Sequence, residues 1–289
     1  MKIGISLGIL HPSLWADITK EADQLGIESV WMPEHLVIPM AMAGSPFAGA
    51  DHPPIPSNVP VFDVFTYLGF LAGQTKNIHF GTQVYNIGLR HPFIVARAVA
   101  TLDVISQGRV EFGIGASWLE AEWQAVGLDF ASRGRRVDES IAICQRLWRD
   151  EIIEEHGEFF DFGPVMFEPK PHHTPWPPLH IGGDGPAALR RAALVGDGWI
   201  PMNHTPEQIP EAAKKIAQIR HDAGREGTTE ITVGVGGAGV DDLRRYADLG
   251  IHRGLVKPWD SSRNAIEGLK RFADEVLPLV VDYPTALPA

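Results

Sequence analysis

Two ionisable side chains directly follow a short apolar segment near the start of the chain. Residues 29–32 read Ser-Val-Trp-Met, and Pro33, Glu34 and His35 come next. A histidine titrates near pH 7, so His35 can exchange a proton with a reacting group or donate a hydrogen bond to a carbonyl. Glu34 can accept hydrogen bonds from a ligand or orient a partner. The pair therefore predicts a proton-transfer site, the alternative being a contact that only holds the following loop.

A glycine-rich turn opens a helical segment in the second half of the chain. Residues 181–188 read Ile-Gly-Gly-Asp-Gly-Pro-Ala-Ala. Free backbone N–H groups at the start of a helix attract anions, so Gly182 and Gly183 predict a phosphate site. The alternative is a tight turn whose glycines serve only the backbone geometry.

Two other segments carry groups suited to a planar ligand. Residues 110–118 contain Gly113 and Gly115, which allow close approach of backbone or ligand, and end at Trp118. No third glycine follows at the spacing of a dinucleotide fingerprint. Residues 81–86 place polar groups at the end of an apolar strand, where a flat ring would need a platform. Ordinary core packing remains the alternative for both segments.

The motifs of metal-dependent and nucleophilic hydrolases are missing from the sequence. His172 and His173 are adjacent in a proline-rich stretch, and neither His-x-His at a strand end nor His-Glu-x-x-His occurs. No Gly-x-Ser-x-Gly is present, and Cys144 lies in an apolar helical pattern that predicts a buried thiol. We therefore expect no metal site.

The elements that must position these groups alternate between short apolar runs and longer amphipathic ones, which is typical of parallel strands joined by helices. The pattern predicts an α/β fold, a (β/α)₈ TIM barrel, as a single domain over residues 1–289. We expect strands at residues 3–7, 29–32, 78–85, 110–115, 179–182, 199–202, 231–235 and 254–257. Helices are expected at residues 14–25, 61–73, 93–106, 120–126, 135–148, 187–194, 206–223, 241–249 and 265–279.

Two long irregular insertions interrupt this pattern, after strand two (residues 33–60) and before strand five (residues 155–178). Active sites of such barrels lie where the strands end and the helices begin. Loops longer than about 12–15 residues are commonly lids or binding loops. Both insertions are therefore predicted to wall or cover the site.

Bulk composition narrows the class of partner. The chain has 289 residues, is 44% hydrophobic and carries a formal net charge of −11, which disfavours general binding to nucleic acid or to anionic membranes. The single cysteine permits no internal disulfide, and residues 1–8 are typical of a strand rather than a signal peptide. No apolar run reaches the ~20 residues that span a bilayer. We expect a cytoplasmic protein that acts on a small molecule.

Taken together, the segments resemble the luciferase-like monooxygenase superfamily, especially its deazaflavin-dependent branch, which uses coenzyme F420. The resemblance covers nearly the whole chain, and its order and spacing are more specific than any one motif. It rests on residues 29–35, on 108–115 with Trp118 and Glu122 after them, on 167–171 and 178–183, and on 196–201.

The resemblance implies a site at the ends of the strands. A non-prolyl cis peptide late in strand three would be the Gln83–Val84 bond, with Asn86 beside the ring's pyrimidine side. Gly182 and Gly183 would receive the cofactor phosphate, and Glu34 and His35 would be the catalytic pair. The residues assigned to the cofactor are Gln83, Val84, Asn86, Ala116, Trp118, Gly182, Gly183, Asp184 and Met202.

One departure from the family bears on the substrate. Sugar-phosphate dehydrogenases of this family place a glutamate where this chain has Trp118, which argues against a sugar-phosphate substrate. The resemblance also implies a possible homodimer.

Three functions remain open on the sequence. The leading one is hydride transfer between F420 and an organic substrate, followed by an FMN-dependent monooxygenase and by a non-catalytic flavin- or deazaflavin-binding protein. F420 carries an anionic tail that requires extra cations, for which Arg190, Lys170 and Lys257 are the candidates.

Overall fold

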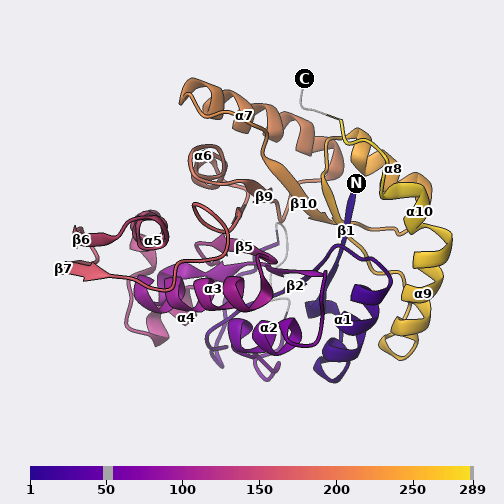
Figure 1. Cartoon of the computed structure of the whole chain (residues 1–289), viewed down its shortest axis with the longest axis horizontal. Helices are drawn as coiled ribbons and strands as arrows, with labels where there is room; N and C mark the ends of the chain where they lie inside the picture. Colours follow the sequence, from indigo (N-terminus) through magenta and orange to yellow (C-terminus); the bar gives the residue numbers. More distant parts are fainter. Residues whose placement is uncertain (48–54, 287–289) are drawn as a thin grey trace.

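Eight parallel strand positions close into a barrel with helices around it (Figure 1). The computed structural model describes residues 1–47 and 55–286. Every neighbouring pair around the ring is parallel, and the pairing of β3 with β5 closes it. In ring order the strands are β3 (His79–Thr82), β2 (Ser29–Met32), β1 (Lys2–Ser6), β11 (Arg253–Leu255), β10 (Glu230–Gly234), β9 (Gly198–Ile200), β8 (Leu179–Gly182), β5 (Val110–Gly115) and β4 (Tyr85–Asn86). The predicted TIM barrel is confirmed.

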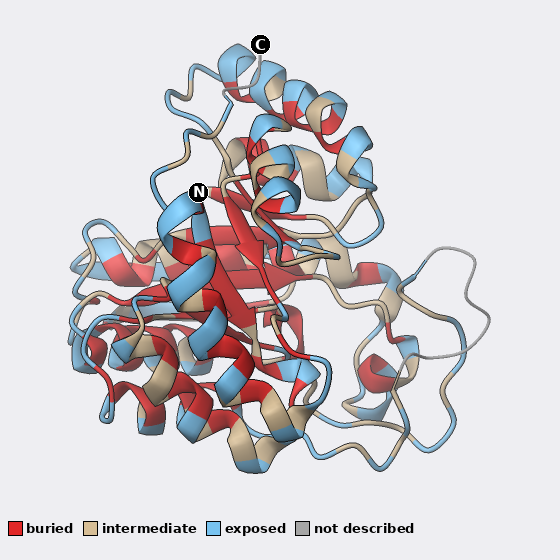
Figure 2. Cartoon of the chain, turned by 90° about the vertical axis from the view of Figure 1, so that its right-hand side faces the viewer, coloured by how far each residue is buried: buried red, intermediate tan, exposed pale blue. Residues whose placement is uncertain are grey.

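The helices cover the outside of the ring and bury one face each. In Figure 2 the strands are almost entirely buried, whereas the helices are buried on one side and exposed on the other. They are α1 (Trp15–Gln24), α2 (Val64–Ala72), α3 (Pro92–Ser106), α4 (Glu120–Ala125), α5 (Arg133–Arg149), α6 (Pro186–Leu194), α7 (Ile209–Asp222), α8 (Val240–Asp248), α9 (Ala265–Glu275) and α10 (Leu277–Val280). Within the two described ranges, none of them has the length and apolar character needed to cross a membrane.

Local sequence signals explain several helix ends. The Asp63 side chain accepts a hydrogen bond from Thr66 N at 2.8 Å, so α2 begins three residues later than the apolar pattern predicts. Thr205 forms a capping box with Gln208 ahead of α7. Gly26 and Gly250 take φ values of 78° and 85° after α1 and α8, a conformation that glycine adopts freely.

The third strand is not continuous, contrary to the expectation of one strand over residues 78–85. It ends at Thr82, and pairing resumes at Tyr85. The Gln83–Val84 peptide between them is cis, at the bond that the family resemblance indicated. Gln83 N still donates to Met32 O at 2.9 Å, so the interruption is anchored to β2.

The second insertion, which the sequence predicts as an irregular stretch over residues 155–178, contains regular structure. It forms an antiparallel hairpin of β6 (Ile152–His156) and β7 (Asp161–Met166), which projects beside α5 in Figure 1. Its apolar residues Val165, Met166 and Phe167 line a groove with α3, outside the barrel. The prediction that residues 155–178 wall the active site is therefore wrong. In the first insertion, residues 48–54 lie outside the described part of the chain.

A buried ionic network fills the end of the barrel where the strands begin. Glu111 on β5 accepts hydrogen bonds from His180 at 2.6 Å and from His79 at 3.1 Å. Arg253, which has no exposed side-chain surface, donates to both carboxylate oxygens of Glu28 at 2.8 and 2.7 Å and forms an ion pair with Glu230. Two groups in this network have the spacing of a cation site: Glu28, His79 and Glu111, and Glu111, His180 and Glu230. The Arg253 guanidinium already lies among the carboxylates of both groups.

Candidate active site

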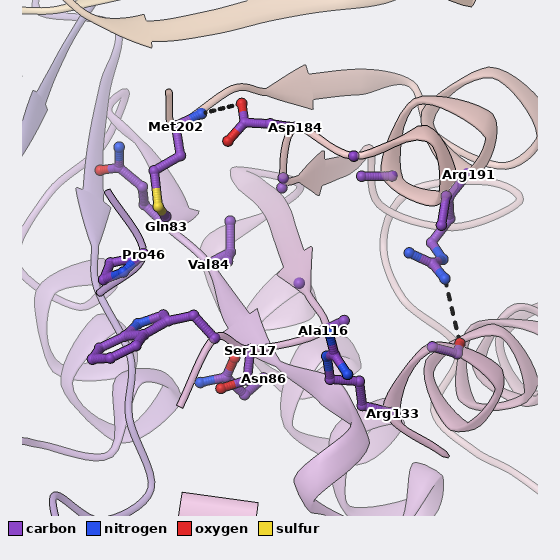
Figure 3. A pocket seen from close by; sticks show the side chains of 18 of the residues that line it. Pro46, Gln83, Val84, Asn86, Ala116, Ser117, Arg133, Asp184, Arg191 and Met202 are labelled. Atoms are coloured by element: carbon purple, nitrogen blue, oxygen red, sulfur yellow. Dashed lines mark hydrogen bonds between the residues drawn. The ribbon is translucent and has the colours of Figure 1, made fainter. Parts of the chain in front are cut away.

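The opposite end of the barrel holds a cavity of about 600 Å³, formed where β2, β4, β5, β8 and β9 end. All eleven residues predicted for the site line it: Glu34, His35, Gln83, Val84, Asn86, Ala116, Trp118, Gly182, Gly183, Asp184 and Met202. In Figure 3, Pro46, Gln83 and Met202 lie on one side of Val84, whereas Arg133 and Arg191 lie on the other. The cavity thus has a largely apolar end and a cationic end.

The floor of the cavity is the Val84 side chain, held between two glycines. A Cβ on Gly115 would lie 2.6 Å from Val84 Cγ2, and a Cβ on Gly182 would lie 2.8 Å from Val84 Cγ1. These distances are shorter than carbon contacts allow. Gly115 and Gly182 therefore let β5 and β8 approach the valine closely, which leaves a smooth apolar surface under any bound ring.

His35 is held from behind by a buried carboxylate. Its Nδ1 lies 3.0 Å from Glu122 Oε2, on α4, and the Glu122 side chain has no exposed surface. The other oxygen of Glu122 accepts hydrogen bonds from Leu36 N at 2.6 Å and Val37 N at 3.3 Å. The Trp118 ring meets the imidazole edge-on, with the ring centroids 5.9 Å apart. Both neighbours restrain the orientation of His35.

The Glu34 carboxylate is directed to protein partners. It forms an ion pair with Arg90 at 2.7 Å and accepts the Asn86 N–H at 2.8 Å. Burial raises the pKa of Glu34, and the Arg90 and Asn86 contacts oppose that rise. Glu34 therefore fixes the segment after the cis peptide. It also lines the cavity, and its catalytic role stays a prediction.

The glycine-rich turn before α6 has the geometry of an anion site. Gly183 takes φ 117°, and the helix begins at Pro186 with no acidic residue in its first turn. Asp184 turns its carboxylate to the neighbouring loop, where Met202 N (2.9 Å) and His204 Nδ1 (2.8 Å) bond it. Burial alone would raise the pKa of Asp184, but these hydrogen bonds outweigh it and lower the pKa. Asp184 thus joins two strand-end loops as a carboxylate.

The cations of the cavity differ from those predicted. Arg133 and Arg191 line it. Arg191 Nε is bonded to Asp138 at 2.6 Å, and Arg133 Nη1 donates to Phe130 O at 3.0 Å, so each guanidinium has further N–H groups to offer. Arg190, Lys170 and Lys257 are not among the lining residues, and Lys170 donates instead to the carbonyls of residues 147 and 150. The three candidate cations therefore lie outside the cavity lining, and a contact of any of them with a cofactor tail stays a prediction.

Several site residues carry little signal in the sequence. Pro46 and Arg133 lie far from the strand ends in sequence, and Ser117 takes φ 65° without being glycine. In the sequence Glu122 belongs only to a family motif, and α4 carries a second acidic residue, Glu120. Nothing in the spacing pairs residue 122 with residue 35; only the closed barrel brings them together.

Comparison with known proteins places this chain in a family. The model of the luciferase-like monooxygenases matches residues 11–242. An uncharacterized protein of Mycobacterium tuberculosis is 28% identical over 276 residues, 92% of this chain and 95% of that protein. A phthiodiolone/phenolphthiodiolone dimycocerosates ketoreductase of Mycobacterium sp. (strain JLS) is 27% identical over 237 residues, 78% of this chain and 62% of the ketoreductase.

Two solved structures share the architecture over nearly their whole length. The monooxygenase RslO1 from Streptomyces bottropensis aligns with a TM-score of 0.77 at 22% identity, covering 96% of this chain and 99% of that one. The coenzyme F420-dependent tetrahydromethanopterin reductase from Methanopyrus kandleri gives the same TM-score and coverage at 17% identity. These likenesses concern the fold. With the family model matched over residues 11–242, the chain belongs to the luciferase-like monooxygenase family, whose members are oxidoreductases and monooxygenases.

Proposed function

We propose that this chain transfers a hydride between the deazaflavin coenzyme F420 and an uncharged organic substrate that carries an alcohol or a carbonyl group. The observation that carries the proposal is the polarity of the cavity. Arg133 and Arg191 lie at one end, Val84 forms the floor, and His35 and Trp118 line the same space. This arrangement suits an anionic tail, a flat ring and a substrate without charge, in that order.

The residues present fit such a cofactor. The ring would rest on Val84, where Gly115 and Gly182 leave no side chain to lift it. The phosphate would lie at the start of α6, since the first turn of a helix offers unpaired N–H groups to anions. Arg133 and Arg191 would hold further negative charge of the tail.

When bound, the deazaflavin ring accepts or supplies the hydride, a reaction that the protein does not itself perform. The chain's own residues handle the proton that accompanies it. The cavity-facing nitrogen of His35 would take the proton of a substrate hydroxyl, or return it to a carbonyl oxygen in the reverse direction. Trp118, Pro46 and Met202 would surround the substrate with apolar surface and exclude water.

The relatives give this proposal further support without deciding the cofactor. The Methanopyrus neighbour is F420-dependent, and the mycobacterial relative is a ketoreductase, so its substrate carries a carbonyl. An FMN-dependent monooxygenase is the second candidate, because the match to the monooxygenase RslO1 is as good and FMN also ends in a phosphate. The apolar floor and the anion site would serve either tricycle.

Titration of the apo-protein with F420 and with FMN, each followed by ligand fluorescence, tests the proposal. We expect tight, saturable binding of F420 and weaker binding of FMN. The F420-loaded protein should then be screened with secondary alcohols and ketones, following the deazaflavin absorbance. The variant His35→Ala should retain F420 binding and lose turnover by about 10²–10⁴-fold. Binding of FMN alone would overturn the F420 assignment, and unchanged turnover in His35→Ala would overturn the role of His35.

A further inference from the structure

We infer that Glu122 is a positioning residue that fixes the tautomer of His35, so that Nδ1 carries the proton and Nε2 presents a lone pair to the cavity. The inference deepens the proposed function, because it explains how His35 is kept ready to accept a proton. Neither Glu122 nor its bond to His35 lies in the cavity itself, since Glu122 does not line it.

The contacts of Glu122 give it one role toward His35. Its side chain is 0% exposed, and its two oxygens face Leu36 N (2.6 Å), Val37 N (3.3 Å) and His35 Nδ1 (3.0 Å). The two backbone groups can only donate, so Oε1 must accept. An ionised carboxylate has no proton to give, so the ring nitrogen facing Oε2 must donate as well.

The other ring nitrogen is thereby assigned. In a neutral imidazole, one nitrogen carries the proton and the other is an acceptor. With Nδ1–H bonded to Glu122, Nε2 is the acceptor, and it has no hydrogen-bond partner among residues 1–47 and 55–286. The His35 side chain is 15% exposed and lines the cavity, so the free nitrogen is the one available to substrate.

The contact between Glu122 and His35 also favours the protonated form of His35. When Nε2 takes a proton from a substrate hydroxyl, the ring becomes positive beside a buried carboxylate, and opposite charges attract strongly where water is excluded. The edge-on Trp118 ring keeps the imidazole from rotating away. Glu122 thus orients His35 and stabilises its protonated form without touching the substrate.

A competing explanation is that Glu122 only anchors the start of the insertion through Leu36 and Val37. The variant Glu122→Gln separates the two roles, because glutamine has the same shape. Its carbonyl oxygen can still accept from Leu36 N and Val37 N at the Oε1 position. Its NH₂ group then occupies the Oε2 position and donates to Nδ1, which moves the ring proton to Nε2. The loop contacts survive while the acceptor facing the cavity is lost.

Histidine ring NMR reads the tautomer directly and needs no cofactor. In apo-protein labelled with ¹⁵N-histidine, long-range ¹H–¹⁵N spectra distinguish a protonated from an unprotonated ring nitrogen, and His35→Gln identifies the His35 signals. We expect protonated Nδ1 in the unmodified protein and protonated Nε2 in Glu122→Gln. The control Glu120→Gln changes an exposed residue of the same helix and should leave the His35 signals unchanged.

Kinetics of the F420-loaded enzyme supply the second readout. Glu122→Gln should lower kcat by about 10²–10⁴-fold, the range that general acid–base catalysis contributes, with KM changed less than about threefold. Glu120→Gln should match the unmodified enzyme. A protonated Nε2 in the unmodified protein, or an unchanged tautomer in Glu122→Gln, would overturn the inference. Because the NMR uses apo-protein, failure of F420 to bind would refute the proposed function and leave this inference standing.

Discussion

The packing of the cavity floor can be tested by replacing Gly115 with alanine. The new Cβ would lie 2.6 Å from Val84 Cγ2. Carbon atoms in contact are separated by about 3.5–4.0 Å, so the valine would have to retreat by roughly 1 Å. Gly182 closes its other side, where a Cβ would already lie 2.8 Å from Cγ1. The backbone before Val84 is held by the Gln83 N to Met32 O bond, so the added carbon either strains this packing or displaces the Val84 side chain toward the cavity.

The expected cost follows from that crowding. Forcing one extra carbon into a well-packed site costs about 1–3 kcal/mol. If the protein absorbs the strain, the melting temperature should fall by about 2–4 °C per kcal/mol. If Val84 moves into the cavity instead, the same free energy appears as roughly 5–150-fold weaker binding of the cofactor. The two effects together should account for the whole cost.

Two measurements on Gly115→Ala check this reasoning. Thermal unfolding of the apo-protein gives the melting temperature, and a fluorescence titration with whichever tricycle the protein binds gives the affinity. Gly234→Ala is the matched control, because Gly234 ends β10 and has no atom within 4 Å of the added Cβ. A Gly115→Ala protein with unchanged melting temperature and affinity would refute the close packing of Val84.

Other regions of the chain give predictions that simpler assays check. Burial alone would raise the pKa of Glu111, but hydrogen bonds from His180 and His79 outweigh it and hold the pKa well below its usual value. The ionised Glu111 therefore stabilises the fold above about pH 4.5, and this stabilisation is lost as the pH falls through the lower pKa of the folded state. Glu111→Gln should cost about 3–5 kcal/mol of unfolding free energy at pH 7 by denaturant titration, and the gap should narrow in acid. Arg133→Ala should weaken F420 binding by roughly 10–150-fold in a low-salt titration, because a charge-assisted bond is worth ~1.5–3 kcal/mol. Arg190→Ala, which changes a residue outside the cavity lining, should leave the affinity unchanged. Cys144 is buried and burial raises its pKa, so a thiol reagent should label it only under unfolding conditions.

The sequence predicts most of the barrel because apolar residues recur with a different spacing in its strands than in its helices. Residues 110–115 form an unbroken buried strand as expected, since a parallel strand covered on both faces is largely apolar; Glu111, which is paired with His180 and His79, is its one charged residue. The break at Gln83–Val84 could not come from periodicity, because residues 78–85 are apolar enough for one strand. Only the family resemblance indicated it. The β6–β7 hairpin was missed because prolines and glycines obscure its short alternation.

The site was predictable at its strand ends and not beyond them. Parallel strands end on one face of a barrel, so His35, Val84, Trp118 and Gly182 could be gathered from sequence position alone. The partners that orient them depend on side-chain direction. Glu122 reaches His35 across 87 positions of the chain, and the separation carries no pattern.

The charged network around Arg253 has a consequence for how this protein can change. It ties together β1, β5, β8, β10, β11 and the residue that precedes β2, at the end of the ring remote from the cavity. The residues of the network are Lys2, Glu28, Glu111, His180, Glu230 and Arg253. The register of the strands is therefore stabilised by residues that do not line the cavity. Residues at the open end that do not orient His35, such as Pro46 or Met202, can be exchanged to accept new molecules while the scaffold keeps its alignment. Engineering of new specificities should begin there and leave the sealed end intact.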